Sequence, residues 1–413
     1  MKLVILTGNY PYGEQEAFLE PEMRVFERVF ESIHILTLAS PDMCVTRYIP
    51  ENASVTRVNP KKAKNNYFNL IRPSVLREIM FVSKNFNYTL RESISVMLNF
   101  YEKSCPMFLK YLEKEDTSNT VFYSYWLSHY AYVLTRFKQK HPDAFCISRA
   151  HRVDNFIDFK AAFYRREILS TLDGIYPISL EGKKEIENRI FPHIKGKCAK
   201  LKVFHLGVEI SDIVNPPKKQ DKMKVVSCSF IHKLKRLDII IDALSKIDDI
   251  DIEWTHFGSG QDEAQIIRTA KEKLGCKPNI CFNFRGQTAH DDILDYYTKN
   301  HVDLFINSSD HEGIPVSIME AMSAGIICAA REVGGNAELV SDKNGFLLPP
   351  NAGADEYADV IKKTYNLDAE TLSKMKKCAM LKVNEEFASP TVYEKFADEI
   401  FCFYKNKKGG MQA

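Results

Sequence analysis

The feature that most constrains the fold is an alternation of short apolar runs with helical patterns, which is repeated from Met223 onward. The runs KVVSCSF, IDIEWTHFG, NICFNFRG and VDLFINSS are separated by segments such as LDIIIDALSKI and AQIIRTAKEKLG. Near-continuous apolar strands joined by helices are typical of a parallel sheet that is covered on both faces. The first half opens the same way, with KLVILT, a loop and a helical pattern. We therefore predict an α/β chain whose chemistry lies in the loops that follow the strands.

The chain divides most simply into two domains. Its 413 residues, 45% of them hydrophobic, can bury two cores of ordinary size. A segment with Pro216, Pro217 and a charged run separates the halves and has the composition of a linker. We predict an N-terminal domain over 1–208 and a C-terminal domain over 222–388. The amphipathic remainder, 389–413, is predicted to be a closing helix that packs back towards the N-terminal domain.

Residues 61–112 differ from their surroundings, because they are helical in pattern, aromatic and basic before Glu92. The basic residues are Lys61, Lys62, Lys64, Arg72, Arg77, Lys84 and Arg91. One interpretation is a peripheral contact with anionic lipid headgroups on the inner face of the cell membrane. The other is an ordinary solvated helical insertion.

Bulk properties exclude several classes of protein. The 56 basic and 54 acidic residues nearly cancel, so no overall field favours nucleic acid. The ten cysteines are scattered and most lie in apolar stretches, which predicts buried, reduced thiols and a reducing compartment. The apolar run Leu3 to Leu6 is too short for a signal sequence, and no run is long enough to span a membrane. We expect a cytoplasmic protein.

Three weaker patterns are interpreted as structural. Cys276 and Cys281 lack a second Cys/His pair, which argues against a zinc site. The Asp-x-Asp pair at 249 and 251 falls between a helix and a strand, so both are predicted to be turn residues. Gly258 and Gly260 form only part of a dinucleotide-binding fingerprint.

The most informative segment is NSSDHEGIPVSIMEAMSAG, residues 307–325. Pro315 suits the first turn of a helix, and Gly325 suits the position just after its end. This arrangement leaves free amides around Ile314 to Ser317 beyond the end of a strand. Such a helix N-terminus is a ready site for a phosphate.

The two glutamates of this segment have different environments. Glu312 precedes the predicted helix, and Glu320 lies about one and a half turns inside it. A carboxylate beside an anion site needs hydroxyls or a cation as partners, and a sugar nucleotide offers hydroxyls on both sides of its diphosphate. We predict that Glu312 contacts the sugar and Glu320 the ribose. Lys233, Lys235 and Arg236 follow another strand and supply cations.

These residues together resemble a known family. The two glutamates of EGIPVSIME, with seven residues between them, look like the paired-glutamate signature of the retaining GT-B glycosyltransferases of family 4. The similarity continues through AMSAG, VGGNAELV and NGFLLPP, and more loosely through the first half. It implies the GT-B fold, in which two Rossmann-like domains face each other across a cleft.

The resemblance also implies roles for individual residues. Glu312, Lys235 and His151 take the catalytic positions, with Lys235 as the lysine that contacts the donor diphosphate and His151 as the histidine that faces the transferred sugar. The donor-binding positions are Gly13, Arg236, Gly313, Ile314, Pro315, Val316 and Glu320. The chain departs from the family at Phe230, where an arginine is often found and a phenyl ring cannot replace its phosphate contact.

The resemblance predicts a hexosyltransferase-type enzyme that retains the anomeric configuration and needs no metal or other cofactor. The donor would be a nucleotide-diphosphate sugar. The acceptor would be a saccharide, lipid-linked, in the biosynthesis of a surface polysaccharide. Two alternatives stay open: a non-catalytic sugar-binding or scaffold protein, motivated by Phe230, and a nucleotide-sugar epimerase of the same fold.

Overall fold

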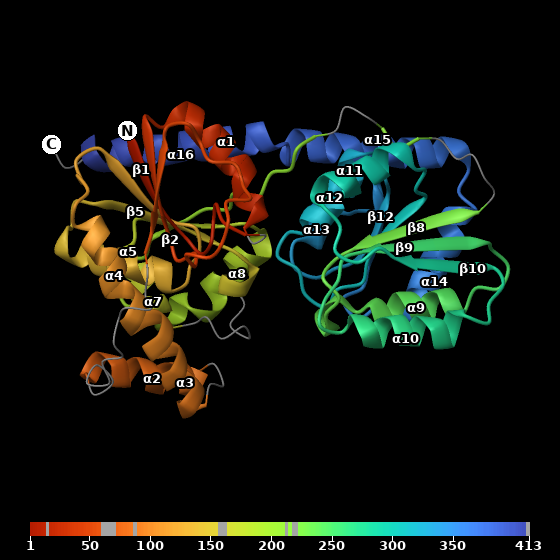
Figure 1. Cartoon of the computed structure of the whole chain (residues 1–413), viewed down its shortest axis with the longest axis horizontal. Coiled ribbons are helices and arrows are strands. Elements are labelled where there is room, and N and C mark those ends of the chain that lie inside the picture. The colour runs from red at the N-terminus through yellow and green to blue at the C-terminus, as the bar shows by residue number, and fades with distance from the viewer. Residues whose placement is uncertain are drawn as a thin grey trace. The chain divides into compact units, whose positions relative to one another are not determined.

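A computed structural model of the chain describes residues 1–13, 16–58, 72–85, 89–155, 163–210, 214–216 and 222–409. These residues form two compact units (Figure 1). Unit 1 combines Met1–Leu206 with Val392–Ala413, and unit 2 is Gly207–Thr391.

Unit 1 is built on a parallel sheet. Within the described ranges its seven strands have the order β3-β2-β1-β4-β5-β6-β7. Their bounds are β1 Lys2–Thr7, β2 Ser32–Thr37, β3 Ala53–Arg57, β4 Thr120–Ser124, β5 Phe145–Ala150, β6 Gly174–Pro177 and β7 Lys200–Leu201. Every pairing is parallel. The strand KLVILT is confirmed as β1, and its alternate residues are buried in two different cores, one on each face of the sheet.

Helices cover both faces of this sheet, as its apolar strands require. They are α1 Glu20–Val29, α2 Pro73–Asn85, α3 Leu90–Val96, α4 Lys103–Leu112, α5 His129–Lys140, α6 Arg152–Asn155, α7 Arg165–Thr171, α8 Leu180–Arg189 and α16 Ser389–Gly409. Shorter turns are η1 Ala17–Leu19, η4 Met97–Glu102 and η6 Phe191–His193. One core joins the sheet to α1 and α16, and the other joins it to α4, α5, α7 and α8. Helix α16 begins at the end of unit 2 and packs its later turns on unit 1.

A buried ion pair lies beside α16. The guanidinium of Arg149 is 3.4 Å from the carboxylate of Glu22, and neither side chain is exposed. Arg149 also donates to the carbonyls of Phe204 and His205, and it lies over the ring of Phe396 at 4.5 Å. The arginine therefore ties β5, α1 and α16 together.

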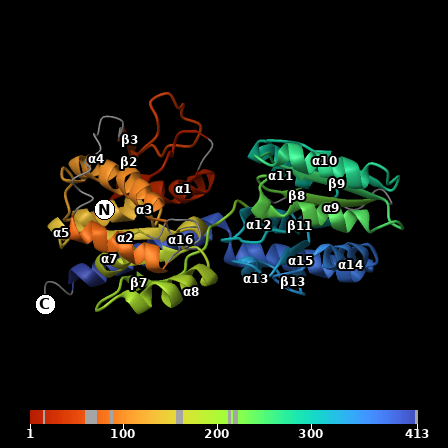
Figure 2. The same ribbon diagram turned by 90° about the horizontal axis from the view of Figure 1, so that it is seen from below.

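The segment between β3 and β4 is helical where the structure describes it, in α2, α3, η4 and α4. Figure 1 places α2 and α3 outermost on the side of unit 1 that carries α5 and α7. In Figure 2, which is seen from below, the two helices lie in front of the rest of this unit. Four of its basic residues are exposed, namely Arg72, Arg77, Lys84 and Arg91. Lys61, Lys62 and Lys64 lie outside the described residues.

Unit 2 repeats the same plan. Its six described strands have the order β10-β9-β8-β11-β12-β13, again with parallel pairings. They are β8 Met223–Cys228, β9 Ile252–Phe257, β10 Ile280–Phe284, β11 Leu304–Asn307, β12 Cys328–Arg331 and β13 Gly345–Leu348. The helices are η7 Lys233–Lys235, α9 Leu237–Ser245, α10 Glu263–Leu274, α11 His290–Lys299, α12 Val316–Ser323, α13 Asn336–Leu339, α14 Ala354–Tyr365 and α15 Ala369–Glu386. Helices α9, α10 and α14 share one core with the sheet.

In both sheets the strand order reverses beside the first strand. This happens between β1 and β4 in unit 1 and between β8 and β11 in unit 2. At such a point the loops leave neighbouring strands in opposite directions, which opens a crevice for a ligand beyond the carboxyl ends of the strands. The fold thus directs attention to the loops after β1, β4, β8 and β11.

Some sequence interpretations are corrected and others are confirmed. Most cysteines were expected to be buried, but only Cys105, Cys146 and Cys328 are, and four of the ten are exposed. The other seven lie in loops, in the half-exposed helices α15 and α16, in the edge strand β10 and at the end of β8, where the side chain meets water at least in part. Asp249 and Asp251 do lie in the turn between α9 and β9. In the described part of the chain, no helix has both the length and the apolar composition to cross a membrane.

Candidate active site

The loops after β8 and β11 are joined directly to each other. The N–H of Asp310 donates to the carbonyl of Leu234 at 2.8 Å. The hydroxyl of Ser308 donates to the carbonyls of Lys235 and Arg236, each at 2.9 Å. These contacts bring Lys235 and Glu312 together, although they are 77 residues apart, and the Lys235 Nζ lies 2.6 Å from the Glu312 Oε1.

The Lys235–Glu312 ion pair is mostly buried, with 20% of the lysine side chain and 7% of the glutamate side chain exposed. Burial opposes ionisation of Glu312. The charge of Lys235 and hydrogen bonds from Lys235, Ser309 and Asn307 outweigh it and hold the pKa of Glu312 below its ordinary value. The ammonium uses one of its three N–H donors on Glu312, so the pair can still bind an anionic and a hydroxyl-bearing group.

Helix α12 begins beside this pair. It starts at Val316 with Pro315 as its N-cap, one residue outside the first turn in which the sequence placed the proline. The first N–H groups of a helix have no carbonyl partner within it, so those of α12 can receive a phosphate. Gly325 follows the helix with a φ of 75°, as predicted from its position.

Two glycines allow another loop to pack against this segment. A Cβ on Gly334 would lie 1.9 Å from the carbonyl oxygen of Glu312, and one on Gly335 would lie 2.5 Å from that of Gly313. Gly335 also donates its N–H to Gly313 at 2.6 Å. A larger residue at either position would push the loop away, so the sequence VGGN keeps Glu312, Gly313 and Ile314 in place.

Glu320 lies inside α12 and is buried. Its Oε1 lies 2.7 Å from the Nε2 of His290, at the start of α11. That hydrogen bond raises the pKa of His290 above its ordinary value, so the imidazole ring carries more positive charge near neutral pH than it would without Glu320. The site therefore presents two carboxylates, each matched to a cationic partner.

Arg236, predicted to bind the donor, is held by acids of its own unit. Its guanidinium contacts Asp238 at 2.9 Å and Asp310 at 3.2 Å, and Arg331 also contacts Asp310. The guanidinium thus orders the loop that carries Lys235. Phe230, in the same loop, is 71% exposed and offers an aromatic face where the family often has a cation.

In unit 1 the loop after β1 forms an anion-binding turn that is filled by the carboxylate of Glu16. The N–H groups of Gly8, Asn9 and Tyr10 donate to this carboxylate at 2.8, 2.7 and 2.6 Å, and the indole N–H of Trp126 donates at 2.5 Å. Trp126 follows β4, so the contact lies at the switch point of the first sheet.

His151 follows β5 in the same unit and is buried among aromatic rings. Its ring centre lies 4.7 Å from those of Tyr125 and Trp126 and 5.4 Å from that of Phe18. Burial and the nearby Arg149 hold the pKa of His151 well below its ordinary value, so the ring is neutral at pH 7. Its Nε2 has no hydrogen-bond partner among the described residues.

Gly13 adopts a φ of 68°, a conformation that glycine favours. Its N–H donates to the carbonyl of Cys44 at 3.2 Å, and its carbonyl accepts from Thr46. The glycine therefore fixes the end of the first loop against the segment after β2.

The sequence did not single out several residues of the site. Asn307 donates to Glu312 at 3.1 Å, and its position as the last residue of β11 was an available signal. No signal in the sequence marked His290, Asp310 or Glu16, because each acts through a partner that is distant in the sequence or through backbone amides. No local pattern reports such contacts.

Part of this chain is similar in sequence to known glycosyltransferases. The sequence model of the family described as glycosyl transferases group 1 matches residues 209–381. The amylovoran biosynthesis glycosyltransferase AmsK of Erwinia amylovora is 26% identical over 214 residues, which are 48% of this chain and 50% of that protein. The putative colanic acid biosynthesis glycosyltransferase WcaL of Escherichia coli is 27% identical over 210 residues, which are also 48% of this chain and 50% of that protein. The chain thus matches about half the length of these relatives.

Solved structures match nearly the whole chain. The lipopolysaccharide outer core galactosyltransferase WaaB has a TM-score of 0.69 at 16% identity, over 97% of this chain and 99% of its own. Anabaena HepE in complex with UDP-glucose has a TM-score of 0.65 at 16% identity, over 97% of this chain and 100% of its own. With two Rossmann-like sheets and these neighbours, the chain has the GT-B fold, and the part that carries Lys235, Glu312 and Glu320 matches the glycosyl transferases group 1.

Proposed function

We propose that this protein is a glycosyltransferase that transfers a sugar from a nucleotide-diphosphate donor to a saccharide acceptor with retention of configuration. The observation that carries the proposal is the Lys235–Glu312 ion pair at the switch point of the second sheet, beside the N-terminus of α12. A cation and free amides suit a diphosphate, and a buried, ionised carboxylate suits a sugar hydroxyl.

Each residue then has a distinct role. Lys235 and the amides of Val316 and Ser317 stabilise the negative charge that grows on the leaving diphosphate. Glu312 accepts hydrogen bonds from the transferred sugar, and Glu320, oriented by His290, accepts them from the ribose. Gly313, Ile314 and Pro315 shape the turn between these groups. In unit 1, neutral His151 faces the transferred sugar and Gly13 shapes the first loop.

The reaction needs no separate general base in this scheme. The departing diphosphate oxygen accepts the proton of the acceptor hydroxyl, which attacks from the same face of the sugar. The bond from the anomeric carbon to the donor oxygen breaks as the bond to the acceptor oxygen forms. No metal is required, because Lys235 and the helix amides carry the leaving-group charge. An inverted product anomer, determined by NMR, would contradict this mechanism.

A surface polysaccharide precursor, lipid-linked, is the proposed acceptor. Two relatives that match about half of the chain are named for the biosynthesis of amylovoran and colanic acid. Because Anabaena HepE was crystallised with UDP-glucose, UDP-sugars are the first donors to test.

Donor binding is expected to raise the melting temperature of the purified protein. A ligand at 100 times its Kd stabilises the folded state by about 2.7 kcal/mol, which for a domain of this size is on the order of 5 °C. We expect such a shift with one nucleotide sugar of a panel, and its loss in Glu320→Gln. The matched control is Asp291→Asn, an exposed carboxylate that also lies near the ring of His290. A panel without any shift would favour the non-catalytic alternative.

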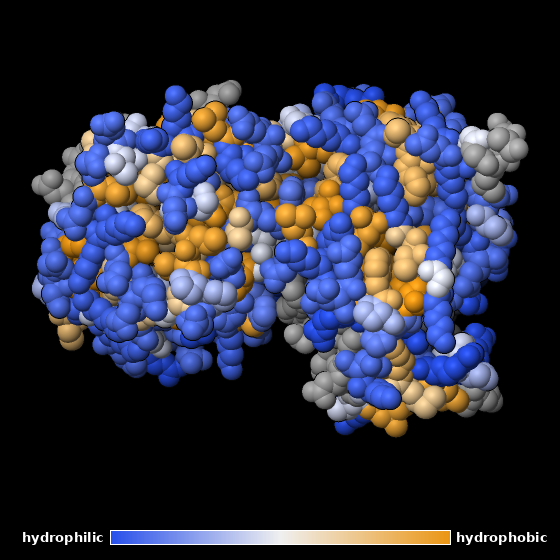
Figure 3. Space-filling model, turned by 180° about the vertical axis from the view of Figure 1, so that it is seen from behind, coloured by the Kyte–Doolittle hydropathy of each residue, from blue (hydrophilic) through white to orange (hydrophobic). Residues whose placement is uncertain are grey.

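Unit 1 is also proposed to contact an anionic membrane through α2 and α3. These helices expose Leu76, Met80 and Leu90 beside Arg77, Lys84 and Arg91, a mixture that suits the lipid interface. Hydrophobic and hydrophilic side chains are interspersed on this protruding part in the space-filling view (Figure 3). The triple change Arg77→Ser, Lys84→Ser and Arg91→Ser is expected to reduce co-sedimentation with anionic vesicles by about tenfold or more, because each cation contributes about 1 kcal/mol. If the triple variant and the unaltered protein sedimented equally with anionic vesicles, an electrostatic contact between unit 1 and the membrane would be excluded.

A further inference from the structure

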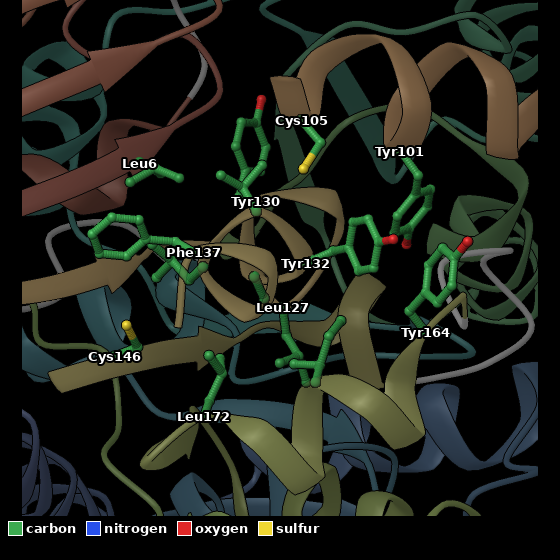
Figure 4. Close-up of a cluster of buried hydrophobic side chains, with 14 of the residues drawn as sticks. Leu6, Tyr101, Cys105, Leu127, Tyr130, Tyr132, Phe137, Cys146, Tyr164 and Leu172 are labelled. Carbon is green, nitrogen blue, oxygen red and sulfur yellow. The ribbon is translucent and has the colours of Figure 1, made fainter. Parts of the chain in front are cut away.

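Unit 1 contains a cavity that none of the roles above uses. Its volume is about 320 Å³, and it lies between α2, the η4–α4 region, α5 and the start of α7. The lining includes three aromatic residues, a cysteine and two arginines, namely Tyr101, Tyr132, Tyr164, Cys105, Arg72 and Arg136. Four of them, the three tyrosines and Cys105, are drawn in Figure 4.

The inner part of the cavity is aromatic and closely packed. The rings of Tyr132 and Tyr164 stack at 4.1 Å with an angle of 16°. Tyr101 lies 5.4 Å from the first and 5.3 Å from the second, and its hydroxyl donates to the carbonyl of Phe163. Val75 and Leu109 extend this apolar lining. A planar or hydrocarbon group would therefore find a preformed surface here.

The position of α2 over this lining is fixed by a buried carboxylate. Glu78 of α2 accepts the N–H of Tyr164 at 2.6 Å and contacts the guanidinium of Arg166 at 2.9 Å. That guanidinium lies 3.5 Å from the ring centre of Phe81. The charge of Glu78 is thus compensated by Arg166, and the wall formed by α2 is held to the start of α7.

The outer part of the cavity is cationic. Arg72 precedes α2, Arg136 lies one helical turn after Tyr132 in α5, and both residues line the cavity. Both are exposed, and within the described ranges neither forms an ion pair. Among the described residues that line the cavity, none is Asp or Glu. Ser74 and the first amides of α2 add further donors.

We infer that this cavity binds a phosphate ester. Two guanidinium groups with serine and backbone donors suit a doubly charged phosphate, which they can contact through paired hydrogen bonds. The tyrosine lining takes the organic substituent, and the volume is that of a small ligand site. The phosphate ester has two sources, a prenyl-type lipid phosphate or a water-soluble sugar phosphate. The inference concerns unit 1 alone and does not depend on the transfer reaction.

Titration calorimetry on the full chain tests the inference with geranyl phosphate and glucose 1-phosphate. We expect one of them to bind, and Arg72→Ala and Arg136→Ala each to weaken it by about tenfold or more, as for the loss of a charge-assisted hydrogen bond. Arg28→Ala, an exposed arginine of α1 outside the cavity, is the matched control and should bind as the unaltered protein does. Tighter binding of geranyl phosphate assigns a lipid source, and tighter binding of glucose 1-phosphate assigns a water-soluble one.

A second measurement reports on the cavity without any substitution. Cys105 lines the cavity, whereas Cys276 is an exposed thiol in unit 2. The bound ester should slow alkylation of Cys105 several-fold, measured by peptide mass spectrometry, and leave Cys276 unchanged. Three outcomes would overturn the inference. They are absence of binding by both esters, a loss of affinity in Arg28→Ala equal to that in Arg72→Ala, and unchanged alkylation of Cys105. None of these outcomes bears on donor binding by unit 2, so the two proposals can fail separately.

Discussion

Replacing Lys235 with methionine is expected to lower the turnover of glycosyl transfer by about 100-fold or more, since a preorganised charge at the leaving group contributes on that scale. The same change removes the cation 2.6 Å from Glu312, whose side chain is only 7% exposed. An uncompensated buried carboxylate costs about 3 kcal/mol in the free energy of unfolding. Turnover is measured with the donor identified by thermal shift, and stability by denaturant unfolding.

A double variant separates the two effects. In Lys235→Met/Glu312→Gln, the neutral amide needs no cation, so stability is expected to recover while transfer stays lost. The matched control is Lys273→Met, which breaks the ion pair with Asp242 at the surface of the same unit. Surface pairs contribute about 0–1 kcal/mol, so this variant should retain nearly full stability and turnover. Full turnover in Lys235→Met would refute the proposed role of the lysine.

Replacing Arg149 with methionine is expected to lower the stability of unit 1 by about 4 kcal/mol, because Glu22 would keep a fully buried charge without its partner. The carbonyls of Phe204 and His205 would lose their donors, and Phe396 of α16 would lose the guanidinium beside it. We expect α16 to become more accessible to protease as unit 1 unfolds more often.

The loss in Arg149→Met should depend on pH in a defined direction. Burial raises the pKa of Glu22, and the charge of Arg149 partly offsets this. Without the arginine, the pKa of Glu22 in the folded protein rises further. At low pH the carboxyl group of Glu22 is protonated and carries no buried charge. The folded protein therefore loses stability as the pH increases through that pKa. The deficit should therefore be smaller near pH 4.5 than near pH 7.5, as measured by unfolding at both.

The control for this position is Arg28→Met. Arg28 contacts Glu394 of the same helix α16 at 3.2 Å, but both side chains are more than half exposed. We expect a change of about 0–1 kcal/mol there. Adding Glu22→Gln to Arg149→Met should recover part of the stability and remove most of the pH dependence. A pH-independent deficit would show that lost packing, rather than the charge of Glu22, causes the effect.

The sequence was sufficient to predict the class of the fold and the main loop of the site. Alternating apolar and helical runs predicted both parallel sheets, because burial on two faces leaves a continuous apolar strand. The segment 307–325 predicted a strand end, a loop, a helix and a glycine stop, and the structure has β11, α12 and Gly325 in these places. These signals are local, since turn residues and helix caps act within a few positions.

The partners of the charged residues could not be predicted in this way. Glu320 meets His290, and Glu16 meets three backbone amides and Trp126. Arg236 was expected to face the donor, and the structure places it between Asp238 and Asp310. Each contact depends on which loops the strand order makes neighbours. Burial of the cysteines also depended on where strands and helices end and on which of their faces meet water, which an apolar run does not reveal.

The sequence by itself determined the α/β class, the order of strands and helices, and the loops that carry Lys235, Glu312 and Glu320. Periodicity and turn chemistry act over short stretches and need no knowledge of the rest of the chain. Only the tertiary structure decided that β8 lies beside β11, which brings Lys235 to Glu312 across 77 residues and compensates a buried charge. It also decided that Arg149 meets Glu22 and that three tyrosines and two arginines line one cavity, because such contacts arise only when distant elements pack together.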